Sequence, residues 1–215
     1  MFTLYATKGS VGSAAVEAAL TLVDVKFDLV DAVPWSLGPN VDRLTLLNPL
    51  TQVPTLVSPT GEVMTESAAI LIHLGLMFPT SGLLPTATWP RAQNIRGLVF
   101  IAANCYPDIS VIDFPDRYCA GSGDEERRRI RSATTQHLHM LWNNFAKAFP
   151  GKPFLAGECV GALDLLAASV SKCFGSRPYL REQVPGFAEL MQRVDADSRF
   201  REVHDRHWPP RASTS

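Results

Sequence analysis

The sequence predicts an α/β domain followed by an all-helical domain. Of its 215 residues, 46% are apolar and 19% are charged, which is the composition of a globular protein. Strand and helix patterns alternate over the first 78 residues, whereas the remainder shows helical patterns only. The length suits one large domain or two small ones. We therefore expect two domains of different structural class.

The first domain is predicted to contain a mixed, four-stranded sheet. Residues 2–6 alternate between core-type and polar side chains, as strands do, and Ser13 precedes an Ala/Leu-rich helical run over 14–22. Further strand patterns cover 27–30, 53–57 and 62–64, and a helix pattern covers 66–77. A β-α-β crossover makes parallel strands, whereas the short turn at Thr60-Gly61 makes an antiparallel hairpin. The combination gives a mixed sheet.

A segment rich in Pro, Gly, Ser and Thr, residues 78–86, marks the predicted domain boundary. We place the first domain at 1–78, a linker at 79–88 and the helical domain at 89–215. Helix patterns in this last part cover 89–107, 124–148, 161–175 and 186–194. The first 78 residues carry three basic and seven acidic side chains, a net charge of −4, whereas the remainder carries +3.

Charge and cysteine content exclude several functional classes. The net charge of −1 provides no positive field for a nucleic-acid backbone or an anionic membrane, so neither is expected as a partner. We find no leader pattern and no apolar run of about 20 residues. The four cysteines form no Cys-x-x-Cys pair and are too sparse for a disulfide framework. A cytoplasmic location is therefore expected.

Two motifs then identify a family resemblance. Residues 48–56 read Asn-Pro-Leu-Thr-Gln-Val-Pro-Thr-Leu, and residues 65–71 read Thr-Glu-Ser-Ala-Ala-Ile-Leu. Together they resemble the glutathione-binding core of the cytosolic glutathione transferases, and the resemblance covers essentially the whole chain. Segments 104–107 and 113–117 resemble a bacterial subgroup. The resemblance implies a thioredoxin-like first domain, a C-terminal helical bundle, glutathione as cosubstrate and a homodimer.

The resemblance also implies roles for five residues of the two motifs. Val53, before a cis Pro54, would hold the cysteinyl backbone of glutathione like an added strand. Gln52 would reach the glycyl end or the backbone, Glu66 the ammonium group, and Ser67 the γ-glutamyl carboxylate. A helix start suits a carboxylate because its backbone N–H groups are free. Taken alone, each residue is interpreted as part of an ordinary helix cap or strand start. Their co-occurrence, however, favours a role in glutathione binding.

The residue that activates the glutathione thiol is expected in the loop after the first strand. Ser10 falls where serine-type members of the family, such as the theta and zeta classes, place their activating serine. Thr7 is the alternative if the loop register is shifted. A purely structural role, with Ser10 and Ser13 as loop and cap residues, stays open. No cysteine precedes Cys105, so conjugation or peroxide reduction is favoured over mixed-disulfide exchange.

The helical domain is expected to supply an apolar pocket for an electrophile, with Tyr106 and Phe114 as its residues. Core packing is the competing interpretation of such aromatic side chains. Asp164, three residues after Gly161, matches a helix-start motif of this domain, with Gly161 in place of the usual Ser or Thr. We interpret that motif as structural.

No metal site is expected. His204 and His207 lack a third ligand at a suitable spacing, and they lie near a C-terminal tail that the sequence predicts to be mobile. The leading hypothesis is a glutathione transferase that activates the thiol for attack on an electrophile or peroxide. The alternative is a non-catalytic binding or interaction module of the same fold, and Thr51, in place of the family's usual Gly, keeps it open.

Overall fold

A computed structural model describes residues 1–209 and contains a four-stranded sheet in the order β2-β1-β3-β4. The strands are β1 (Phe2–Ala6), β2 (Phe27–Asp31), β3 (Thr55–Val57) and β4 (Val63–Met64). β1 and β2 run parallel, whereas β3 is antiparallel to both β1 and β4. Leu4 lies opposite Leu29 on one side and Leu56 on the other. The predicted mixed sheet is confirmed.

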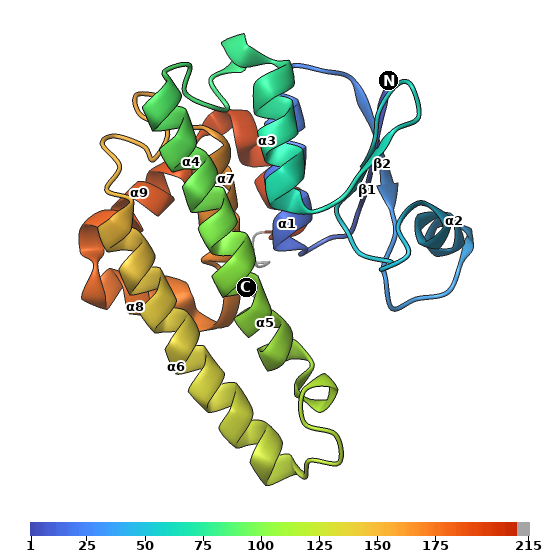
Figure 1. Ribbon diagram of the computed structural model, residues 1–215, viewed down its shortest axis with the longest axis vertical. Coiled ribbons are helices and arrows are strands. Elements are labelled where there is room, and N and C mark those ends of the chain that lie inside the picture. The colour runs from blue at the N-terminus through green and yellow to red at the C-terminus, as the bar shows by residue number, and fades with distance from the viewer. Residues whose placement is uncertain (210–215) are drawn as a thin grey trace, which may run out of the picture.

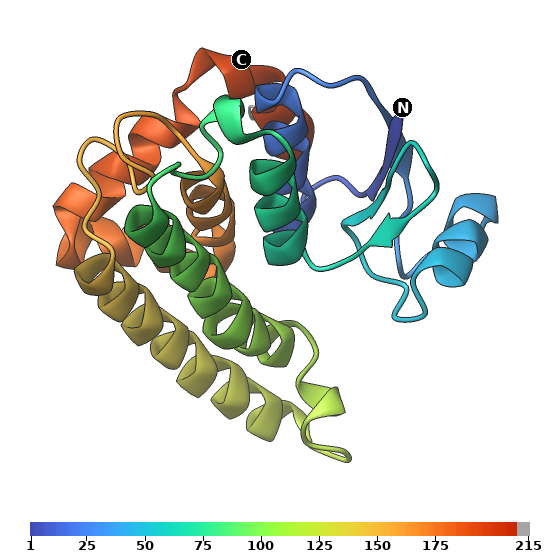
Figure 2. The same cartoon turned by 45° about the horizontal axis from the view of Figure 1, so that its top comes forward.

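Three helices complete the first part of the chain (Figure 1). They are α1 (Val11–Leu22), α2 (Pro39–Leu47) and α3 (Ser67–Met77). α1 and α3 lie side by side between the sheet and the remaining helices, and α2 lies on the other side of the sheet (Figures 1 and 2). Tyr5, Ala32 and Leu44 form a small core beneath α2. This arrangement is thioredoxin-like, as expected.

All named elements after residue 78 are helical, which confirms the predicted bundle. They are η1 (Pro79–Ser81), α4 (Thr88–Phe100), the π-helical segment Ile101–Cys105, α5 (Tyr106–Asp113), η3 (Pro115–Arg117), α6 (Asp124–Ala148), α7 (Ala162–Val170), η4 (Cys173–Gly175), α8 (Ser176–Gln183), α9 (Pro185–Asp195), η5 (Ser198–Phe200) and α10 (Arg201–His207). α6 lies alongside the helix formed by α4 and α5 (Figure 1). α7 is buried throughout and packs against α1.

The continuous helix Thr88–Asp113 is long and apolar enough, at 26 residues, to cross a membrane by length and composition alone. This differs from the sequence-based expectation that no such segment exists. Leu98, Ile101 and Cys105 are nevertheless part of the protein core. Core helices of globular proteins pass the same test, so one helix of this kind is weak evidence for a membrane.

The main hydrophobic core continues across the proposed domain boundary. It includes Leu20 and Leu71 from the first part and Leu98, Trp142 and Phe145 from the second, all fully buried. Burial of such side chains is the dominant favourable contribution to folding. The division at residue 78 therefore remains our proposal for the chain's organisation, with the two parts sharing one core.

The helix-start motif at α7 ties the preceding loop to the start of the helix. The Asp164 carboxylate accepts hydrogen bonds from the N–H groups of Leu155 (2.7 Å), Ala156 (3.0 Å) and Gly161 (3.0 Å). A Cβ atom on Gly161 would lie 2.5 Å from Ala156 Cβ and 2.8 Å from the Leu83 carbonyl oxygen. Close packing thus explains why glycine replaces the usual Ser or Thr.

The C-terminal helix α10 is anchored to α1 by a buried polar cluster. Glu17, in the middle of α1, is 1% exposed, and its carboxylate is paired with Arg206 and lies 3.0 Å from His207 Nε2. His207 is therefore buried against α1, whereas the tail predicted to be mobile, residues 209–215, lies outside the described part except for its first residue. Within residues 1–209, no group of three His, Cys, Asp or Glu side chains could hold a metal ion.

The buried His207 makes stability depend on pH. Burial and the neighbouring Arg206 lower the pKa of His207 from about 6.5 to about 4. A second proton would go to Nδ1, which is buried and has no partner among residues 1–209. Because the unfolded chain takes up this proton first, the contribution of His207 is complete above pH 6.5 and is lost as pH falls to 4.

We expect His207→Gln to remove this dependence, because glutamine still donates a hydrogen bond to Glu17 but does not titrate. Between pH 7 and pH 4, the wild type should lose about 3 kcal/mol more unfolding free energy than the variant. Urea unfolding followed by circular dichroism measures the difference. Parallel pH profiles for the two proteins would contradict the assignment.

Candidate functional site

The candidate site begins where β1 passes into α1. Ser10 caps the helix: its Oγ accepts a hydrogen bond from the Ser13 N–H (3.3 Å), and its own N–H donates to the Thr7 carbonyl (3.2 Å). The helix starts at Val11, so the expected start after Ser13 was wrong, because Ser13 already lies in its first turn. A hydroxyl that accepts through a lone pair keeps its proton, so Ser10 retains a donor.

Thr7 and Ser10 differ in exposure. Thr7, just after β1, is 6% exposed, whereas Ser10 is half-buried at the open start of α1. The Thr7 side chain is therefore less accessible to a ligand than the Ser10 side chain is.

A buried asparagine organises the loop that leads into β3. Asn48 Nδ2 donates to the Gln52 carbonyl and to Thr55 Oγ1, both at 3.1 Å, and Asn48 Oδ1 accepts from the Leu50 N–H at 3.1 Å. The Gln52 carbonyl also accepts from the Thr55 hydroxyl at 2.8 Å, while the Gln52 residue itself is exposed. Asn48 was not predicted to have this role, although asparagine commonly bonds to nearby backbone in turns.

The backbone of this loop has two unusual conformations. Thr51 has a φ of 51°, in the left-handed region that favours glycine, the residue that the resemblance implies at this position. The Val53–Pro54 peptide bond is cis, as the resemblance implied. Among residues 1–209, the backbone N–H and C=O of Val53 make no hydrogen bond. Val53 therefore presents an open donor and acceptor to an extended ligand.

The start of α3 forms the next wall of the site. Glu66 precedes the helix with a φ of 65°, which is rare for a residue other than glycine, and it is exposed. Ser67, the first residue of α3, is buried. The first N–H groups of a helix lack partners within it and carry partial positive charge. The site thus combines an exposed carboxylate with an anion-binding helix end.

These elements meet around Gly12. A Cβ atom on Gly12 would lie 3.0 Å from Pro54 Cδ, 3.0 Å from Tyr106 Oη and 3.3 Å from Ser67 Cβ. The first turn of α1, the loop before β3, the start of α3 and α5 therefore converge at one point. Gly12 was not predicted as a site residue, because the sequence patterns place it in the loop before the expected helix, where glycine is ordinary.

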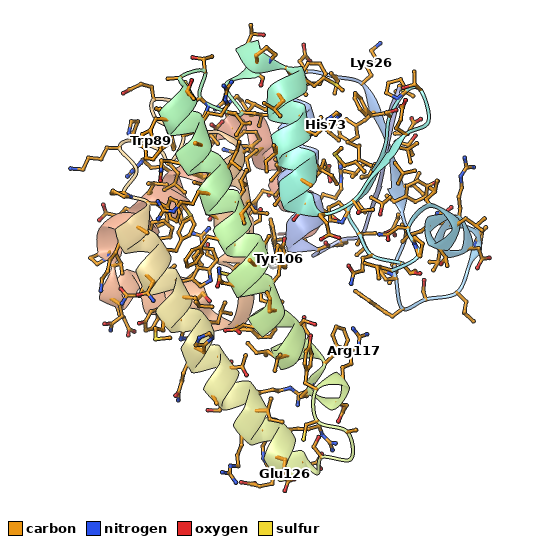
Figure 3. The ribbon with its side chains drawn as sticks, viewed as in Figure 1. Lys26, His73, Trp89, Tyr106, Arg117 and Glu126 are labelled. Carbon is orange, nitrogen blue, oxygen red and sulfur yellow. The ribbon has the colours of Figure 1, made fainter. Side chains whose placement is uncertain are left out.

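Tyr106 is the residue of the helical part that reaches the convergence around Gly12. Its hydroxyl oxygen lies 3.1 Å from Ser67 Oγ, and Figure 3 shows it where α4 and α5 face the starts of α1 and α3. Burial raises the pKa of Tyr106 well above its usual value, so the phenol keeps its proton at neutral pH.

Phe114 lies elsewhere. It follows the last residue of α5, is 41% exposed, and its ring is covered by the Arg117 guanidinium at 3.9 Å. The eight residues of α5 span about 12 Å at the usual helical rise, and Figure 3 shows Arg117 at the far end of this helix from Tyr106. The structure therefore does not bring Tyr106 and Phe114 together.

Comparisons with known proteins agree with the motif-based resemblance. Residues 4–81 match the family described as glutathione S-transferase, N-terminal domain. The chain is 25% identical to the uncharacterized GST-like protein YncG of Escherichia coli, over 96% of this chain and 98% of that protein. It is 26% identical to glutathione S-transferase U14 of Arabidopsis thaliana, over 85% and 76% of the two chains.

A solved structure shows the same fold. A glutathione transferase homologue from Sulfitobacter, with bound glutathione, superposes with a TM-score of 0.82. The two proteins are 19% identical, and the superposition covers 95% of this chain and 97% of that one.

Proposed function

Because the chain belongs to the cytosolic glutathione transferase superfamily, we propose that it binds glutathione and activates its thiol as a thiolate. The thiolate would attack an electrophile or a peroxide. The observation that carries this proposal is the convergence around Gly12, where two helix starts, Pro54, Ser67 and Tyr106 meet. Two anion-binding helix ends at one point suit a ligand with both a carboxylate and an ionisable thiol.

The peptide-like ligand would lie along the loop before β3. Val53 would pair with the cysteinyl backbone through its free N–H and C=O, as in strand addition. Ser67 and the N–H groups of α3 would hold the γ-glutamyl carboxylate, and the exposed Glu66 would hold the ammonium group. Gln52, exposed beside this edge, would reach the glycyl end.

Ser10 would stabilise the thiolate without forming a covalent bond. A free thiol with a pKa of about 8.5 is only about 3% ionised at pH 7. Lowering that pKa by about 2 units makes the thiolate about three-quarters of the population, a gain of about 25-fold. The start of α1 supports this role because its partial positive charge also favours an anion.

Two of the protein's four cysteines do not compete for this chemistry. Burial raises the pKa of both Cys105 and Cys173 to about 12, so both remain neutral thiols. All four cysteines are unpaired, in keeping with the proposed cytoplasmic location. No metal takes part in the proposed reaction. Phe114 remains our proposed electrophile contact, at the outer end of α5.

The first test of this function concerns Ser67 and Glu66. Ser67→Ala and Glu66→Ala should each weaken glutathione binding by about 1.5–3 kcal/mol, the usual value for hydrogen bonds to charged groups. Isothermal titration calorimetry measures the change. Glu62→Ala, in the exposed turn between β3 and β4, is the matched control and should bind like the wild type. Unchanged affinity in both site variants would refute the assignment.

A second test concerns the thiol itself. Thiolate absorbance of bound glutathione should titrate below the free value, and Ser10→Ala should return the pKa toward it with little loss of affinity. Ser10→Asp keeps an acceptor for the helix cap but donates no proton, so it should retain stability and still fail to lower the pKa. Thr7→Ala is the comparison for the alternative donor.

The same titration separates an enzyme from a binding module. If Thr7→Ala raises the thiol pKa and Ser10→Ala does not, the mechanism holds with Thr7 as donor. If bound glutathione titrates like the free thiol in all proteins, the loop contains no activating group. The non-catalytic module would then be the better description.

We further propose a two-fold symmetric homodimer. Exposed apolar side chains on both parts of the chain, including Val63, Trp89 and Val99, provide surface for it. A stable interface should bury more than about 1,000 Å² in total. Light scattering should therefore give twice the 23.5 kDa chain mass at micromolar concentration, and a 23.5 kDa species would refute the dimer.

A further inference from the structure

The hydrogen bond between Tyr106 and Ser67 links residues 39 positions apart and joins the two parts of the chain. Tyr106 Oη and Ser67 Oγ are separated by 3.1 Å, and either oxygen has a proton to donate. Phenols are more acidic than alkyl hydroxyls, so a phenol is the stronger donor and a serine oxygen the stronger acceptor. The favoured arrangement therefore has Tyr106 donating to Ser67.

Donation by Tyr106 makes Ser67 a hydrogen-bond donor toward the ligand site. Its hydroxyl has one proton, and accepting from Tyr106 leaves that proton free to donate outward. Consecutive hydrogen bonds also polarise one another, which strengthens the outer bond. Since the Tyr106 phenol stays protonated, the donor is present throughout the neutral range.

Local packing restricts the position of the phenol. Tyr106 Oη would lie 3.0 Å from a Cβ on Gly12, so a larger residue there would push against the phenol. The π-helical segment Ile101–Cys105 ends directly before Tyr106. Such segments change the direction of the side chains that follow them and are frequent at functional sites. Figure 3 shows Tyr106 at the junction with the first part of the chain.

We propose that Tyr106 is a positioning residue for glutathione, acting through Ser67, rather than a contact for the electrophile. Its phenol orients the Ser67 hydroxyl toward the γ-glutamyl carboxylate. This inference rests on the proposed function and changes the role expected for Tyr106 from the sequence. It also makes glutathione binding depend on the helical part of the chain.

The test compares Tyr106→Phe with Tyr118→Phe. Tyr118 donates a similar bond to Ser110 Oγ at 2.9 Å, but at an exposed position beyond α5, so it is the matched control. Calorimetry with glutathione and with S-hexylglutathione gives the affinities. Tyr106→Phe should weaken both ligands by the same factor, about three- to tenfold, the value of one hydrogen bond. Tyr118→Phe should change neither.

A double-mutant cycle then tests the route through Ser67. In the Ser67→Ala background, Tyr106→Phe should have no further effect, because the hydroxyl that it orients is gone. An equal loss in both backgrounds would overturn the inference, because Tyr106 would then act independently of Ser67. A loss confined to S-hexylglutathione would also overturn it and return Tyr106 to the electrophile pocket. Melting temperatures of all variants show whether each is folded.

The outcomes separate this inference from the proposed function. Binding that depends on Ser67 but not on Tyr106 overturns the inference alone. A wild-type protein that binds no glutathione overturns both.

Discussion

Helix α1 is buried over nine successive residues, from Gly12 to Leu20, because α3, α7 and α10 pack around it beside the sheet. Small residues, mostly alanine, allow this close approach. The helix therefore has little freedom to shift, and its first turn is held against Pro54, Ser67 and Tyr106. The packing around α1 therefore fixes the geometry of the candidate site.

The buried stretch of α1 contains one charged residue, Glu17, whose carboxylate has to be paired. Glu17 would be costly in such an environment without partners. Arg206 and His207 supply them from the last helix of the described chain, 189 and 190 residues away. The C-terminal segment is thus part of the support for the helix that carries Ser10. The sequence does not predict this contact, because nothing local indicates that the Glu17 carboxylate is buried.

Some residues of the candidate site are positioned by their neighbours in the sequence, and others by contacts between distant parts of the chain. Thr51, Val53 and Glu66 belong to loops whose backbone conformations are set nearby, by Asn48 and by the start of α3. Tyr106 comes from the helical part and reaches the site only because both parts share one core. The complete arrangement therefore needs both parts of the chain.

Side-chain patterns in the sequence were sufficient to predict the order of the strands along the chain, their mixed pairing and the long helix at 124–148. The motifs were sufficient to predict the two segments that carry Val53 and Ser67. These features depend on side-chain periodicity and turn residues, which are properties of neighbouring positions. The helical elements α5, α8 and α10 were not distinguished, and the start of α1 was placed too late. Contacts between distant residues decided the rest: the approach of Tyr106 to Ser67, the need for Gly12, the separation of Phe114 from Tyr106 and the Glu17 cluster. Such contacts depend on how elements pack in three dimensions, and periodicity along one chain does not specify that packing.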